Sequence, residues 1–172
     1  MKNQTLALCI FMGLARSPAA FAQPSEAVEF RKHPFSLEVG SGLNGVLPFF
    51  HLKSGWRPTV QEPVELFLDY SFWNLGQSPA WLQVVLVGGK YYLPTQTALH
   101  PFLTASTGLT ALIGGPVVGN AGFVSLTTPI APVLQAGAGL DLMMTDSLGL
   151  SGAILLGTPF VVRPELNVRW KF

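Results

Sequence analysis

The segment Val162-Arg163-Pro164-Glu165-Leu166-Asn167-Val168-Arg169-Trp170-Lys171-Phe172 divides its side chains into two sets. Even positions carry apolar residues, and odd positions carry polar or charged ones. Successive side chains of a β-strand point to opposite faces, whereas a helix would spread these charges around its circumference. The alternation therefore predicts a β-strand over 162–172 with one apolar face and one charged face.

The same alternation recurs upstream. It is clearest in 35–43, 64–72 and 134–143, and weaker in 82–92, 99–109 and 148–156. An eighth strand is predicted at 46–53, because Asn44-Gly45 is a strong two-residue hairpin signal. Pro48 argues against this strand, since proline cannot donate a ladder hydrogen bond. The pattern predicts eight antiparallel strands.

The composition excludes several classes of protein. Only 11% of the 172 residues are charged, against about 25% in an ordinary soluble domain. With 49% hydrophobic residues, the chain is too apolar for intrinsic disorder. A net charge of +1 without a Lys/Arg cluster leaves no footprint for nucleic acid. The 18 glycines and 14 prolines count against long helices.

The N-terminal segment has the features of an export signal. A basic start with Lys2 precedes an apolar run, and Ala20-Phe21-Ala22 offers a cleavage site. We expect a cleaved signal peptide over 1–22, a periplasmic segment over 23–34 and the folded domain over 35–172. The one cysteine, Cys9, would leave with the signal, so no disulfide is expected in the mature chain.

The distribution of charge bears on a membrane location. No Asp, Glu, Lys or Arg occurs between Tyr91 and Leu140, yet prolines and glycines interrupt every helix-length apolar run there. A closed β-barrel is the other structure that can span a bilayer. Its charged faces must then line the lumen, since Arg or Lys at mid-bilayer costs about 2–4 kcal/mol. The predicted lumen residues are Glu38, Glu65, Asp69, Asp141, Arg163, Glu165, Arg169 and Lys171.

Aromatic residues cluster at predicted strand ends. Trp73 and Trp81 bracket the second outer connection, and Tyr91 and Tyr92 lie at the periplasmic end of their strand. Amphipathic rings are enriched at both membrane interfaces. We predict that these four residues form interfacial girdles.

Short motifs in the second half of the chain point to a family. These are Lys90-Tyr91-Tyr92-Leu93, His100-Pro101-Phe102, Thr107-Gly108-Leu109, the run Gln135 to Asp141 and Thr145-Asp146. Together they resemble the OmpA-transmembrane/OmpW-like group of the outer-membrane β-barrel superfamily. The ending with Val168, Trp170 and Phe172 resembles the terminal signal read by the barrel-assembly machinery. The resemblance implies an all-β, eight-stranded antiparallel up-and-down transmembrane barrel in a Gram-negative cell envelope.

No catalytic, cofactor or metal residues are predicted. Gly40-Ser41-Gly42-Leu43-Asn44-Gly45 matches G-x-G-x-x-G but lacks the helix that a dinucleotide site needs. His33, His51 and His100 lack metal-ligand spacing, although His51 is a possible lumen residue. A strand would hold His100 and Ser106 roughly 20 Å apart, too far for a catalytic pair. The H-x-S-N motif of the lipid A deacylases is absent.

These features favour a structural or surface-interaction role for a barrel whose lumen is plugged by paired charges. The alternatives are a narrow channel or conduit for small or hydrophobic solutes, and a lipid-modifying barrel enzyme. The apolar connection 110–131, with Phe123 and Val124, is a candidate entry for hydrophobic ligands. Expected partners are outer-membrane lipid and the assembly machinery. A soluble exported β-sandwich or lipocalin-like barrel is the rival fold.

Overall fold

The computed structural model describes residues 33–44, 47–58, 63–74, 81–95, 97–113, 130–158 and 162–172. The predicted signal peptide and residues 23–32 lie outside these ranges. Eight strands account for most of the described chain. They are β1 (Phe35–Asn44), β2 (Leu47–Trp56), β3 (Val64–Asn74), β4 (Trp81–Tyr92), β5 (Leu99–Ile113), β6 (Ile130–Met143), β7 (Leu148–Thr158) and β8 (Val162–Lys171).

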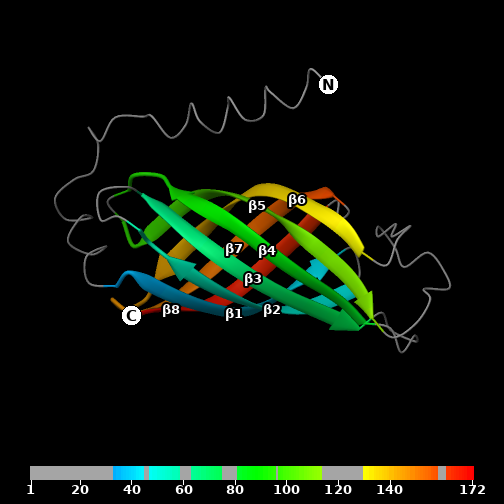
Figure 1. Ribbon diagram of the computed structural model, residues 1–172. Coiled ribbons are helices and arrows are strands. Elements are labelled where there is room, and N and C mark those ends of the chain that lie inside the picture. The colour runs from blue at the N-terminus through cyan, green and yellow to red at the C-terminus, as the bar shows by residue number, and fades with distance from the viewer. Residues whose placement is uncertain are drawn as a thin grey trace, which may run out of the picture.

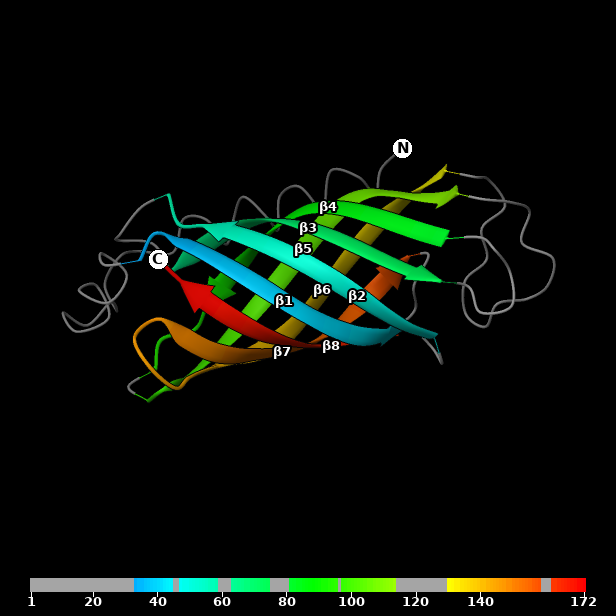
Figure 2. The same cartoon turned by 90° about the horizontal axis from the view of Figure 1, so that it is seen from below.

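The strands form one closed barrel in which each pairs antiparallel with its neighbours in sequence (Figure 1). Closure is made by β1 and β8, from Ser36 opposite Lys171 to Gly42 opposite Glu165. Both ends of the barrel sequence lie at one rim, which we call the terminal end (Figure 2). The opposite rim, where β1 leads to β2, is the loop end. The predicted up-and-down topology is confirmed.

The predicted strand β2 is present despite Pro48. This residue is second in the strand, faces outward and sits opposite Leu43 beside the hairpin. Proline is tolerated near the start of a strand, where a missing donor interrupts the ladder least. β2 also continues to Trp56, so the connection on its far side is shorter than the predicted 54–63.

The strands β5 and β6 are longer than the sequence indicated. β5 continues to Ile113 and β6 begins at Ile130, because their pairing extends to Ala111 opposite Ile130. Of the connection predicted at 110–131, residues 110–113 and 130–131 are therefore strand, and residues 114–129 lie outside the described residues. Phe123 and Val124 lie outside the described residues.

The barrel is apolar outside and charged inside. All six described Lys and Arg residues are buried, as are five of the six described acidic residues. The exception is Asp146, in the turn between β6 and β7. Outward positions carry large apolar side chains such as Leu134 and Leu166, which are 65% and 64% exposed. This inverts the arrangement of a soluble protein.

Inward glycines make room for the large side chains that cross the lumen. A methyl group on Gly139 would lie 2.3 Å from the ring of Phe102, and one on Gly42 would lie 2.5 Å from the ring of Phe49. Small and large residues thus alternate across a narrow barrel, as its taper requires. The described residues contain no helix that is long and apolar enough to cross a membrane.

Candidate functional site

The charged lumen is the candidate site. Arg169 lies near the terminal end of the lumen, where side chains from several strands meet at its guanidinium. Its guanidinium contacts the carboxylates of Glu65 and Asp141, and its Nη1 lies 3.4 Å from Oε1 of Glu38. It also donates to the hydroxyl of Tyr92, which donates in turn to Asp141 at 2.8 Å. Residues from β1, β3, β4, β6 and β8 therefore meet at one cation.

Glu65 extends this network to the terminal rim. Its carboxylate accepts hydrogen bonds from the hydroxyl of Ser36 at 2.9 Å and from Nε of Arg57 at 3.0 Å. The guanidinium of Arg57 also lies 4.7 Å from the centre of the Tyr92 ring. Charge-assisted hydrogen bonds of this kind are stronger than neutral ones, so the rim is held tightly.

The middle of the lumen is closed by two lysines. Lys90 contacts Glu38, while Nζ of Lys53 lies 3.1 Å from Oε2 of Glu165 and 3.9 Å from Oε2 of Glu38. The ammonium groups also sit over aromatic rings, Lys53 at 5.1 Å from Phe67 and Lys90 at 4.6 Å from Phe102. Ion pairs and rings together fill this level.

The contacts of Arg169 form one layer across the lumen, and those of Lys53 and Lys90 form a second. Arg163 forms a third layer, nearest the loop end. Its Nη2 donates to Ser71 at 2.7 Å and to Asp69 at 3.3 Å, and its Nε lies 2.9 Å from Oε1 of Glu165. The guanidinium also stacks 4.2 Å from the ring of Phe49. Arg163 thus reaches from β8 across the lumen to β2 and β3.

An apolar cluster lies in the lumen with Phe49 and contains Leu82, Val84, Leu86 and Val133. These five side chains are at most 1% exposed. Their residues come from the loop-end parts of β2, β4 and β6. The lumen therefore combines a charged section with an apolar cap.

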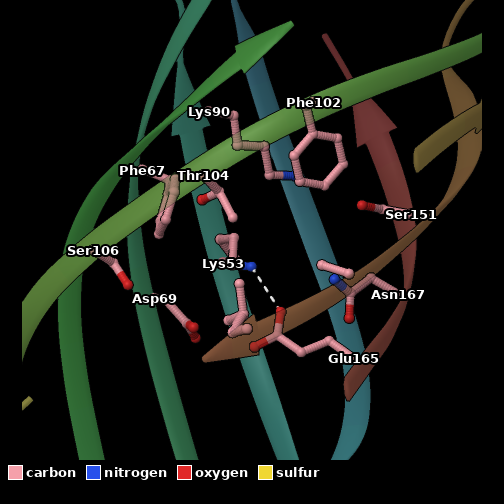
Figure 3. A pocket seen from close by; sticks show the side chains of 12 residues that line it. Lys53, Phe67, Asp69, Lys90, Phe102, Thr104, Ser106, Ser151, Glu165 and Asn167 are labelled. Carbon is pink, nitrogen blue, oxygen red and sulfur yellow. Dashed lines mark hydrogen bonds and ion pairs between the residues drawn. The ribbon is translucent and has the colours of Figure 1, made fainter. Parts of the chain in front are cut away.

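A small void lies among the charged side chains (Figure 3). It lies beside Lys53, Lys90, Asp69, Glu165 and Asn167. The free volume available to the centre of a water-sized sphere is about 10 Å³, roughly the room that one buried water needs. The described lumen residues leave no space there for a larger solute.

The structure places all eight predicted lumen residues inside the barrel. They are between 0% and 8% exposed: Glu38, Glu65, Asp69, Asp141, Arg163, Glu165, Arg169 and Lys171. Seven of them take part in the ion pairs above. Lys171 lies at the terminal rim, opposite Ser36.

The predicted aromatic girdle needs one correction. Trp81 and Tyr91 do face outward, as do Val168, Trp170 and Phe172 of the predicted assembly signal. Tyr92 is only 4% exposed and points into the lumen, so the prediction that it lies at the interface is wrong. Its hydroxyl is held by Asp141 and Arg169. The side chain of Trp73 lies outside what the structure describes.

Three lumen cations were not predicted: Lys53, Arg57 and Lys90. Lys90 and Tyr92 are both even-numbered positions of β4, so they share a face, and Leu82, Val84 and Leu86 share it too. Near the loop end the inward residues of β4 are apolar, as the outward ones are. The alternation of polar and apolar residues that marks the other strands is therefore absent there. The charge of Lys90 is the one signal in β4 that indicates which residues face inward, because the outward positions of the barrel are apolar.

His51, Asp69 and Glu165 offer ligand atoms within 4.8 Å of one another, which is a possible metal cluster. However, Lys53 and Arg163 already neutralise both carboxylates. A divalent ion would add two further positive charges to a buried, balanced site, and buried uncompensated charge is costly. We therefore assign no metal to these residues.

The fold and the lumen together define a class: the chain has the fold of the small eight-stranded outer-membrane barrels. The N-terminal β-barrel domain of Pseudomonas aeruginosa OprF superposes with a TM-score of 0.61 at 15% identity, over 80% of this chain and 96% of that one. Neisserial surface protein A gives a TM-score of 0.56 at 16% identity, over 80% and 94% of the two chains. The resemblance found in the sequence is confirmed at the level of fold.

A barrel from a study of de novo designed transmembrane β-barrels also superposes, with a TM-score of 0.53 at 16% identity, over 80% of this chain and 94% of that one. A designed sequence can thus share this architecture, so the structural similarity indicates the fold and gives no information on activity. No family model matches the chain, and neither does any curated protein.

Proposed function

We propose that this protein is an integral β-barrel of a Gram-negative outer membrane, with a lumen closed by ion pairs and a structural or surface-interaction role. The observation that carries the proposal is the inversion of polarity. Large apolar side chains cover the outside, while Lys, Arg, Asp and Glu pair inside. In water such an exterior would drive aggregation, whereas in lipid it is the stable arrangement.

The height of the apolar exterior supports a membrane location. Trp81 and Tyr91 both face outward near opposite ends of β4, ten residues apart. Ten residues span ~33 Å along a strand. A strand tilt of 35–45° converts this length to ~25 Å of height, which equals the apolar band of known membrane barrels. Their side chains would then lie at the two interfaces.

Export and assembly complete the proposal. Residues 1–22 would direct the chain through the Sec pathway, with cleavage near Ala22. The outward side chains of Val168, Trp170 and Phe172 would then be available to the barrel-assembly machinery. Outer-membrane lipid is the partner that the exterior fits.

The closed lumen favours a scaffold over the alternative of a narrow channel. Three layers of ion pairs and the apolar cap cross the described part of the lumen, and the void beside Lys53 and Lys90 has room for about one water, which supports a plugged barrel. The lipid-modifying enzyme is also less favoured. Of the described histidines, His51 is buried in the lumen, while His33 and His100 lie at the terminal end, away from the outer leaflet.

Two measurements test this function. Folded protein should migrate differently from boiled protein on a denaturing gel and should partition with lipid vesicles. In planar bilayers, the purified barrel should give no steady conductance, while a general porin in the same chamber shows that insertion is detected. Stable channels from the unmodified protein would refute the plugged lumen, and failure to partition would refute the membrane location.

A further inference from the structure

Four outward aromatic residues form a continuous patch across three neighbouring strands. They are Phe50 of β2, Tyr70 and Phe72 of β3, and Trp81 of β4, and all four are exposed. The centre of the Phe72 ring lies 6.1 Å from that of Phe50, 6.2 Å from that of Tyr70 and 6.4 Å from that of Trp81. These distances are typical of packed aromatic pairs. We call these four residues the aromatic patch.

The aromatic patch distinguishes one side of the barrel from the other. In β5, β6 and β7 the large apolar side chains that are exposed among the described residues are all leucine or isoleucine. Contact with lipid requires only apolar side chains, whereas aromatic residues are enriched at the centres of protein–protein interfaces. The side of the barrel formed by β2, β3 and β4 therefore has the composition of an interface.

Tyr70 lies far from both ends of the apolar exterior. In the strand register it is opposite Val85, which is four residues from Trp81 and six from Tyr91 along β4. Even the shorter interval corresponds to ~10 Å of height in a tilted strand, which is more than a tyrosine side chain extends. In a membrane, the Tyr70 hydroxyl would therefore lie among the lipid tails and away from the polar headgroups.

The hydroxyl of Tyr70 takes part in no hydrogen bond within the described chain, although its ring contacts Phe72. The buried hydroxyl of Tyr92, by contrast, is paired with Asp141 and Arg169. Lipid tails carry neither donors nor acceptors, and an unpaired hydroxyl in hydrocarbon is costly. A second chain at the same depth in the membrane can supply the missing partner.

A second copy of this chain meets that requirement. Two-fold symmetry brings the same surface of both copies together, and an axis along the membrane normal places each residue at the depth of its counterpart. A phenol hydroxyl both donates and accepts, so two Tyr70 hydroxyls complement each other. The exposed positions described in β2, β3 and β4 carry no charged side chain, so this surface offers no counter-ion to a charged partner.

We propose that two copies of the barrel associate in the membrane through the aromatic patch, with their Tyr70 hydroxyls hydrogen-bonded to each other and with Phe50, Phe72 and Trp81 packed around them. A second copy is then the partner in the proposed surface-interaction role. The inference rests on the proposed function, because the hydroxyl lacks a partner only where the exterior lies in lipid.

Energy transfer between labelled copies in lipid vesicles tests the proposal. Protein with Asp146→Cys carries a donor dye in one sample and an acceptor in another, and the samples are mixed at rising ratios of protein to lipid. Transfer should follow a two-copy equilibrium. Tyr70→Phe removes only the hydroxyl and should raise the dissociation constant about three- to tenfold, as for hydrogen bonds between membrane-spanning segments. The matched control Tyr91→Phe, on the outward face near the terminal end, should leave it unchanged.

Three results would overturn the proposal. The copies could stay monomeric at every ratio of protein to lipid. Tyr70→Phe could weaken association no more than Tyr91→Phe. In a separate oxidation experiment, a single cysteine at Leu140 on β6 could form disulfide-linked dimers while one at Tyr70 does not, whereas we expect the reverse. A wrong membrane location is distinguished from all three, because the barrel would then fail to partition into the vesicles.

Discussion

Replacing Arg169 with methionine is the sharpest perturbation of the charged lumen. Arg169 is fully buried and contacts Glu38, Glu65 and Asp141. Glu38 would keep Lys53 and Lys90, and Glu65 would keep Arg57. Asp141 would lose the cation that contacts its carboxylate, retaining its hydrogen bond from Tyr92 and the more distant charge of Lys90.

The expected loss follows from removing the cation that contacts the Asp141 carboxylate. Removing one partner of a buried ion pair typically destabilises a protein by about 3–5 kcal/mol. Adding Asp141→Asn to Arg169→Met removes the negative charge of Asp141. The double variant should therefore recover at least half of the lost free energy of unfolding. The matched control is Arg57→Met at the terminal rim, whose partner Glu65 keeps Arg169 and Ser36. Its loss should be smaller than that of Arg169→Met, because Glu65 is not left without a cation.

The assay is urea unfolding of the folded barrel in lipid vesicles, followed by tryptophan fluorescence and by the mobility of unboiled samples. Three results would refute the reasoning about the lumen. Arg169→Met could be no more destabilising than Arg57→Met. The loss could fall below about 1 kcal/mol. Alternatively, Asp141→Asn could add to the loss instead of reversing it.

The other predictions concern packing, an unpaired amide and the exterior. Gly88→Ala should destabilise the barrel by about 1–3 kcal/mol in urea unfolding, because the new methyl would lie 2.6 Å from the Phe67 ring. The adjacent Gly89→Ala should be neutral, because its new methyl would lie 3.6 Å from the backbone oxygen of Glu65, an ordinary contact distance, and equal losses would contradict the inward and outward assignment. Gln135→Leu should leave stability unchanged or raise it, since the buried amide of Gln135 has no hydrogen-bond partner among the described residues; a large loss would point to an unseen polar partner. Leu166→Arg, on the outward face, should lower stability in vesicles by about 2–4 kcal/mol, whereas Thr158→Arg near the loop end should be tolerated, and similar effects of the two would argue against a lipid-facing band.

The strands could be predicted from the sequence because outward-facing and lumen-facing positions differ in kind along most of them. In β8 every inward residue is polar and every outward residue is apolar, so the phase is unambiguous. In β4 the inward residues Leu82, Val84 and Leu86 match the outward ones in character. The face of Tyr92 was misjudged for this reason, although the shared parity with Lys90 could have corrected it.

The partners within the lumen could not be predicted. Lys90 meets Glu38 across 52 positions of sequence, and Arg163 meets Asp69 across 94. Such pairs depend on the register of all eight strands, which sets the height of each side chain in the closed barrel. Alternation gives the face of a residue but not its height. The hydrogen bond between His51 and Asn167 depends on that same register.

The central claim is that the exterior of the barrel faces lipid while its charged interior is closed. Cys9 lies in the predicted signal peptide, so single cysteines can be placed at Leu68 and Leu140 on the outward face and at Asp146 in the terminal-end turn. Spin labels at these sites in lipid vesicles report exposure to oxygen, which concentrates in lipid, and to a water-soluble relaxing agent. We predict that Leu68→Cys and Leu140→Cys respond to oxygen alone and that Asp146→Cys responds to the aqueous agent. Strong aqueous relaxation at the two outward positions would contradict the claim.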